Sequence, residues 1–163
     1  MQVPGPHYSP FHPHSRPMPP PAPPVSRALA GSALVSSVVI AIGAFLPWSK
    51  MLVRGSAIEE VTGFEDAGVA PFFVAWLGAM FAVAALTAGK TTNEAEVVPG
   101  AVGLILCGSS WLLTVRNSDE AVLRWVSDGL FVSLAGSVAL FVIGVMAIVQ
   151  DRRWRWAAVT RSA

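Results

Sequence analysis

Residues 129–150 read GLFVSLAGSVALFVIGVMAIVQ, and none of these 22 residues has an ionisable side chain. Three further runs, at residues 28–49, 67–89 and 97–115, also lack Asp, Glu, Lys, Arg and His. A helix of about 20 residues crosses the hydrocarbon core of a bilayer, so each run is long enough to span a membrane. The sequence therefore predicts an all-α membrane protein built on a bundle of four transmembrane helices.

The composition supports this prediction. Hydrophobic residues make up 53% of the chain and charged residues only 13%, whereas about a quarter of the residues in a soluble domain are charged. The runs also lack the alternation of polar and apolar residues that is typical of a transmembrane β-barrel. The predicted spans lie at about 28–47, 69–88, 97–115 and 129–150.

The charges outside the spans predict the orientation. Taken together, the segments 1–27, 89–96 and 151–163 hold more bases than acids, whereas 48–68 and 116–128 hold more acids than bases. By the positive-inside rule, both termini are expected in the cytoplasm, in a multi-pass protein of the cell (inner) membrane. The first span follows a long tail, so we expect an uncleaved signal anchor rather than a signal peptide.

The two tails differ in composition. Residues 1–26 contain ten of the thirteen prolines and precede the predicted four-helix domain at 27–150, so a disordered tail of polyproline II character is expected. Its P-x-x-P spacing, from Pro20 to Pro23, fits either a docking ligand for a cytoplasmic partner or a solubilising tail.

The stretch RRWRW lies in the basic and aromatic tail at 151–163. Its arginines attract anionic lipid headgroups and its tryptophans favour the membrane interface. It is either an ordinary membrane anchor or a regulated switch that binds lipid or protein. The residues predicted at the membrane interface are Trp48, Trp125, Arg152, Arg153, Trp154, Arg155 and Trp156.

Two outer loops are predicted. In the loop at 48–68, β-branched and other apolar residues flank Gly55-Ser56, which indicates a short hairpin over 50–62 that lies on the bundle. In the loop at 116–128, Ser118 is a candidate helix cap. The apolar residues Val122, Trp125 and Val126 follow at positions i, i+3 and i+4. They predict a short helix that lies on the membrane or runs straight into the fourth span.

Small residues recur at spacings of four or eight within the spans, and such spacing makes a groove on one helix face where another backbone can approach. The bundle itself is expected to use most of these grooves. Any surplus would serve a membrane-protein partner or a second copy of the chain. The predicted packing residues are Ser32, Ser36, Gly78, Ala82, Ser133, Ser137, Gly136 and Gly144.

The fragment Gly89-Lys90-Thr91 matches the end of a phosphate-binding loop, but Ala84 occupies the place of that motif's first glycine. The motif also needs a strand before it and a helix after it, whereas this fragment follows a predicted span. We therefore expect no nucleotide site, and we interpret Gly89 as a helix stop and Lys90 as an anchor at the inner face.

The remaining chemistry is sparse. All three histidines, His7, His12 and His14, lie in the proline-rich tail, and Cys107 is the only cysteine, so no intrachain disulfide can form. No catalytic residue, cofactor site or metal site is expected, and no nucleic-acid partner. Because the apolar runs contain no ionisable group, a proton-coupled transport mechanism is not expected either.

The stretch GAFLPWSKMLVRGSAIEEVTGFEDAGVAPFF, residues 43–73, resembles a pattern in small four-span membrane proteins of high-GC actinobacteria. In that pattern a first span ends in Leu-Pro-Trp, and a glycine-punctuated outer loop leads to the second span. The resemblance covers roughly residues 28–90 and implies an envelope location and no catalytic residues. The arrangement is also similar to claudin-type bundles, by analogy only, because the outer cysteine pair of those proteins is missing here.

Two functions follow as expectations. The first is a non-enzymatic accessory or assembly subunit of a cell-envelope membrane complex. Its contact surfaces would be the small-residue grooves, the outer loop at 48–68 and the proline-rich tail. The alternative is a small, oligomeric, passive transporter or channel for a neutral solute, lined by hydroxyl groups such as those of Ser36, Ser109 and Ser133.

Overall fold

The structure is a computed structural model, and it describes residues 27–53, 57–66, 69–88, 93–116 and 122–161. Several predictions fall outside these residues. They concern the proline-rich tail, the Gly55-Ser56 turn, the fragment around Lys90 and the Ser118 cap.

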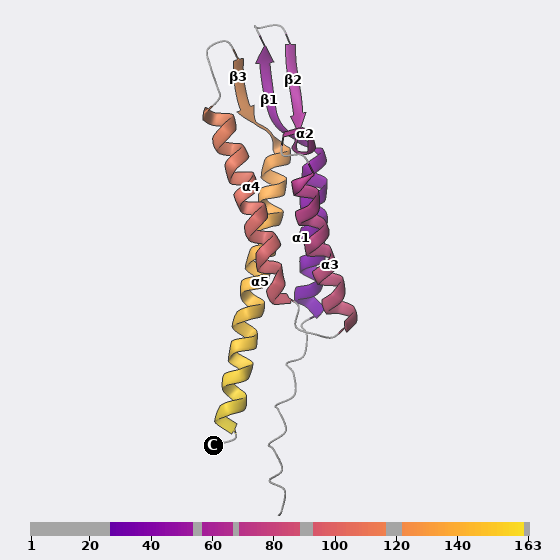
Figure 1. The fold of residues 1–163 in the computed structure, drawn as a ribbon, viewed down its shortest axis with the longest axis vertical. Helices are drawn as coiled ribbons and strands as arrows, with labels where there is room; N and C mark the ends of the chain where they lie inside the picture. The colour runs from indigo at the N-terminus through magenta and orange to yellow at the C-terminus, as the bar shows by residue number, and fades with distance from the viewer. Residues whose placement is uncertain (1–26, 54–56, 67–68, 89–92, 117–121, 162–163) are drawn as a thin grey trace, which may run out of the picture.

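Four long helices form the body of the protein (Figure 1). They are α1 (Arg27–Phe45), α3 (Ala70–Ala88), α4 (Val97–Arg116) and α5 (Asp128–Arg161). All four are long and apolar enough to cross a membrane, which confirms the predicted multi-pass membrane protein. Large apolar side chains are exposed on every one of them, for example Val35, Met80, Ile105 and Val142. That surface suits lipid as the surrounding solvent.

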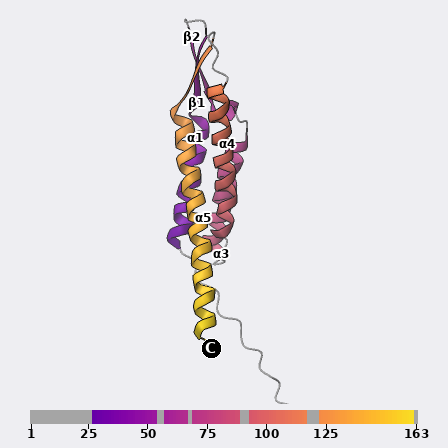
Figure 2. The same cartoon turned by 90° about the vertical axis from the view of Figure 1, so that its left-hand side faces the viewer.

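The helices do not pack evenly around the bundle. α1 lies against α3 and α5, and α4 lies against α5, whereas α3 and α4 have the least contact of the neighbouring pairs (Figures 1 and 2). The packing core follows α1, α3 and α5 and includes Ala33, Ile40, Ala82 and Leu140. The bundle is therefore closed on three sides and less tightly closed on the fourth.

Glycines explain why α4 lies so close to α5. A Cβ at Gly100 would overlap the backbone of Phe141, and one at Gly103 would overlap the side chain of Ser137. Because glycine has no side chain, two backbones can approach closely at such positions. In a membrane, packing rather than the hydrophobic effect holds helices together. α4 is thus held against α5, and it has less contact with α3.

A three-stranded antiparallel sheet stands beyond one end of the bundle (Figure 1). Its strands are β1 (Pro47–Val53), β2 (Ala57–Thr62) and β3 (Val122–Val126), in the order β2-β1-β3. The pairing of β1 with β2 confirms the predicted antiparallel pair at 50–62. The sheet continues away from the helices, however, and does not lie on the bundle as predicted.

The short membrane-surface helix predicted after residue 118 is wrong over 122–126. This segment is β3, and it pairs with β1 in a register that places Ser49 opposite Val126 and Leu52 opposite Leu123. A run of apolar and β-branched residues also suits a strand, and the exposed edge of β1 supplies the hydrogen-bonding partner. The amide of Ser127 then donates to the carbonyl of Trp48 at 2.9 Å, and α5 begins at Asp128.

Two shorter elements complete the fold. α2 (Gly63–Asp66) follows β2 directly, and Thr62 and Glu65 cap it reciprocally. The Thr62 amide donates to Glu65 Oε2 at 2.9 Å, and the Glu65 amide donates to Thr62 Oγ1 at 3.3 Å. This is a capping box. η1 (Asn93–Glu96) is a single turn of 3-10 helix that leads into α4.

Helix α5 extends well past the other helices at the end away from the sheet (Figure 1). The predicted basic tail is therefore helical as far as Arg161. Asp151 and Arg155 form an ion pair of 2.6 Å between Oδ2 and Nε, one helical turn apart.

Candidate functional site

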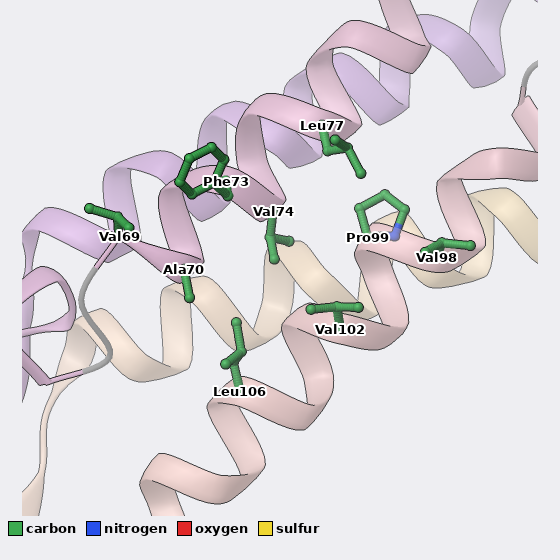
Figure 3. A pocket seen from close by; sticks show the side chains of 9 residues that line it. All are labelled: Val69, Ala70, Phe73, Val74, Leu77, Val98, Pro99, Val102 and Leu106. Atoms are coloured by element: carbon green, nitrogen blue, oxygen red, sulfur yellow. The ribbon is translucent and has the colours of Figure 1, made fainter.

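A hollow lies between α3 and α4, where the bundle is least closed (Figure 3). It encloses about 620 Å³ and lies on the side of the bundle. We call it the α3/α4 groove. Its lining residues are all apolar: Val69, Ala70, Phe73, Val74, Leu77, Val98, Pro99, Val102 and Leu106.

Side chains from both helices point into the space between them, and α5 passes behind it (Figure 3). Val74 and Pro99 are buried at the bottom of the groove, whereas Phe73 and Val98 are exposed at its rim. Pro99 is accommodated because it lies in the first turn of α4, where a missing N–H costs little. The groove therefore opens sideways, toward the lipid that surrounds the bundle.

An acidic side chain lies beyond one end of this groove. Glu96, the last residue of η1, is 0% exposed, and neither of its carboxyl oxygens has a hydrogen-bond partner. A Cβ placed on Gly78 of α3 would lie 3.5 Å from Glu96 Oε2 and close to the side chains of Ser37 and Leu140. The carboxyl group thus lies among α1, α3 and α5.

Helical spacing relates this carboxyl group to the groove. Gly78 is one turn along α3 from Val74, and Glu96 precedes Pro99 by three residues. Residues at i, i+3 and i+4 share a helix face. Glu96 does not line the groove itself, but it precedes Pro99 closely in the chain, and Pro99 lies with Leu77 at one end of the groove (Figure 3).

The position of Glu96 corrects the sequence analysis, which counted it among the charges of an inner loop. The 3-10 turn instead brings the residue back between the helices, because Val97 packs against Gly144 of α5, where a Cβ would overlap it. An ionised carboxylate without a partner in such surroundings is strongly disfavoured. An acidic group inside a membrane bundle points to a functional site, and no sequence signal placed it there.

A buried tryptophan joins the sheet to the helices. Trp48 is 1% exposed and its Nε1 donates to the carbonyl of Gly43 at 2.8 Å. A Cβ on Gly63 would overlap the indole ring, and Leu130 and Cys107 share its apolar cluster. Trp48, which was predicted at the membrane interface, lies at the junction of sheet and bundle with its ring buried in the protein interior.

One face of the sheet carries an ion pair beside exposed apolar groups. Lys50 Nζ lies 2.7 Å from Glu60 Oε1, and this contact raises the pKa of Lys50. Lys50 is also opposite Trp125 in the strand register. Ile58 is 63% exposed and Trp125 41% exposed, and both share the face of Lys50 because directly paired residues, and residues two apart, point the same way.

The predicted packing residues are mostly buried where helices meet. Ser36, Gly78, Ala82, Ser133, Ser137, Gly136 and Gly144 are buried, and Ser32 is exposed. A Cβ on Gly136 would overlap Ile40 of α1, and the Ser133 hydroxyl lies where a Cβ on Gly43 would stand. These small residues therefore serve the contacts within the bundle.

The hydroxyl groups proposed to line a channel do not share a path. Ser109 is exposed on α4 and donates to the carbonyl of Leu106 at 2.9 Å. Ser36 is buried on α1 and bonds the carbonyl of Ser32, whereas Ser133 is buried on α5 beside Gly43. No group of three metal-ligating side chains occurs within the described parts of the chain.

The C-terminal part of α5 carries the predicted interface residues on its surface. Arg152, Arg153, Trp154, Arg155 and Trp156 are all exposed, and they follow the most apolar part of the helix directly. Cationic and indole side chains at such a position suit the headgroup layer.

The comparisons with family models and with curated proteins assign the chain to no family. No protein-family model matches the chain. No curated protein is significantly similar to it.

Proposed function

We propose that this protein is a non-enzymatic subunit of a cell-envelope membrane complex, and that it binds a transmembrane helix of another membrane protein in the α3/α4 groove. In this proposal both termini are cytoplasmic and the sheet is outside the cell. The observation that carries the proposal is the groove itself, an apolar hollow of about 620 Å³ on the side of the bundle where α3 and α4 have little contact.

The distribution of small residues supports this choice of surface. The predicted small-residue contacts are occupied by the chain's own helices, as Gly136 against Ile40 and Gly144 against Val97 illustrate. Lipid tails are as apolar as leucine, so association in a membrane depends on close packing rather than on removal of apolar surface from water. A groove between two helices offers such packing to a ridge of side chains on a third.

The sheet would provide a second contact outside the membrane. Its exposed Ile58 and Trp125 lie beside the ion pair of Lys50 and Glu60. Exposed apolar residues next to charged ones are common at protein interfaces. At the opposite end of α5, the exposed arginines and tryptophans would bind anionic lipid headgroups and fix the depth of the bundle.

A role in transport is the second candidate. The neutral-solute version depended on a shared hydroxyl lining, and Ser109 is exposed on α4 whereas Ser36 and Ser133 are buried. Glu96 favours transport for a different reason, because acidic groups inside membrane bundles often mark ion or proton paths. A small oligomeric passive transporter or channel remains the alternative that the experiment must separate.

The test uses a groove-filling substitution with a matched control. Val102 in the groove and Val142 on α5 are 42% and 47% exposed. The full chain, extracted from native membranes in mild detergent, should bring down a stoichiometric membrane protein. Val102→Trp should lower its recovery at least tenfold, and Val142→Trp should leave it unchanged.

Two results would count against the proposal. Equal recovery with both variants would show that the groove is not the contact surface. Solute flux through liposomes that contain only this purified chain would favour the transport candidate instead.

A further inference from the structure

We propose that the helix bound in the α3/α4 groove carries one lysine or arginine, and that this base pairs with Glu96. The inference rests on the proposed function and names the chemistry of its partner. It begins from a carboxyl group that is fully buried and has no hydrogen-bond partner on either oxygen.

Charge complementarity identifies the partner. Within the described residues, the apolar parts of the four helices contain no Lys, Arg or His. The bases of α1, α4 and α5 lie at helix ends or on the exposed extension, at Arg27, Arg116 and from Arg152 onward, with Arg152 and Arg155 exposed. Buried charges in proteins are paired or neutralised. Among the residues that the structure describes, no base forms an ion pair with Glu96, and we assign the pairing base to the bound helix.

The geometry suits a long basic side chain. Lysine and arginine carry a charged head on an apolar stem of three or four methylene groups. The stem would follow the apolar groove past Leu77 and Pro99, and the head would reach Glu96 beyond them. A Cβ on Gly78 would lie 3.5 Å from Glu96 Oε2 and would overlap Ser37 Oγ, so the Ser37 hydroxyl lies close to the carboxyl group that the head must reach.

Neighbouring groups can complete the hydrogen bonding of such a head. Ser37 Oγ lies against the same point of Gly78 and already donates to the carbonyl of Ala33 at 2.9 Å. Its oxygen lone pairs are therefore available as acceptors. Two carboxylate oxygens and one hydroxyl oxygen match the three donors of an ammonium group.

The experiment uses the complex recovered with the full chain, whose partner is identified by mass spectrometry. The partner should have an apolar span interrupted by a single Lys or Arg. Glu96→Gln and Glu96→Leu should each lower partner recovery at least tenfold. Changing the partner's base to Leu should do the same. Combining that change with Glu96→Leu should restore recovery to within about threefold of the wild type, because neither unpaired charge then remains.

Stability of the isolated chain separates lost binding from misfolding. Neither carboxyl oxygen of Glu96 has a hydrogen-bond partner, so Glu96→Leu should leave the melting temperature of the isolated protein in detergent unchanged or raise it. A partner without an intramembrane base, or full recovery with Glu96→Gln, would overturn the inference and leave the proposed function standing. If no membrane protein is recovered with the wild-type chain, the proposed function fails and the inference fails with it.

Discussion

Replacing Trp48 by Phe tests how the sheet is held to the bundle. The indole of Trp48 is 1% exposed, and its N–H donates to the Gly43 carbonyl at 2.8 Å. Phenylalanine retains an aromatic ring and loses that donor. Losing a buried hydrogen bond of this kind costs about 1–3 kcal/mol, and truncation to Ala would cost about 3–5 kcal/mol because a large cavity forms.

The assay is unfolding in mixed micelles by titration with a denaturing detergent, followed by circular dichroism. Trp125 provides the matched control, because it lies on the same sheet and is 41% exposed. We expect Trp125→Phe to change the unfolding free energy by no more than about 0.5 kcal/mol. Equal losses for Trp48→Phe and Trp125→Phe would refute the argument that the buried indole joins the two parts.

Two further predictions concern the capping box and the α4–α5 contact. The hydrogen bonds from Thr62 lower the pKa of Glu65, so the stability that Glu65 contributes is present above its unfolded-state pKa and is lost as the pH falls through its folded-state pKa. Relative to Glu65→Gln, the wild type should lose its advantage on acidification, and unfolding measured across this pH range checks the sign. Gly103→Ala should destabilise the protein by about 1–3 kcal/mol, because the added Cβ would overlap Ser137. Gly108→Ala is the control and should not destabilise it, because nothing lies within 4 Å of a Cβ at that position. Similar melting temperatures for the two variants would contradict the close α4–α5 packing.

The four spans could be predicted from the sequence because their signal is local. Each run without ionisable residues is long enough to cross a bilayer, and the helices begin and end within a few residues of those runs, except that α5 continues past residue 150 to Arg161. The antiparallel pair of β1 and β2 could be predicted for a similar reason, since its two halves adjoin one turn.

The third strand could not be predicted in this way. Val122, Trp125 and Val126 have helical spacing, but the five-residue segment Val122–Val126 that contains them also suits a strand. The deciding partner, the edge of β1, lies far away in the chain. A local pattern cannot show which of two compatible structures will find a partner.

The candidate site was missed because it depends on how the elements pack. Glu96 follows a short polar stretch, so the sequence places it in a loop. Only the packing of Val97 against Gly144 brings it between the helices. Likewise, four-residue spacing identified Ser36 as a packing residue but could not show that Ser32, on the same predicted groove, is exposed.

Accessibility of single cysteines to a membrane-impermeant maleimide tests the central claim, that lipid surrounds the bundle and the sheet lies outside the cell. Cysteines would be placed one at a time at Ile58 on the sheet, Val142 in mid-span and Trp156 on the extension of α5, in a Cys107→Ala background. All three side chains are exposed on the protein surface, so differences in labelling report their surroundings. The account predicts labelling at Ile58 in intact cells, at Trp156 only after lysis, and at Val142 in neither case. Labelling of Val142 in intact cells, or equal labelling of Ile58 and Trp156 there, would contradict it.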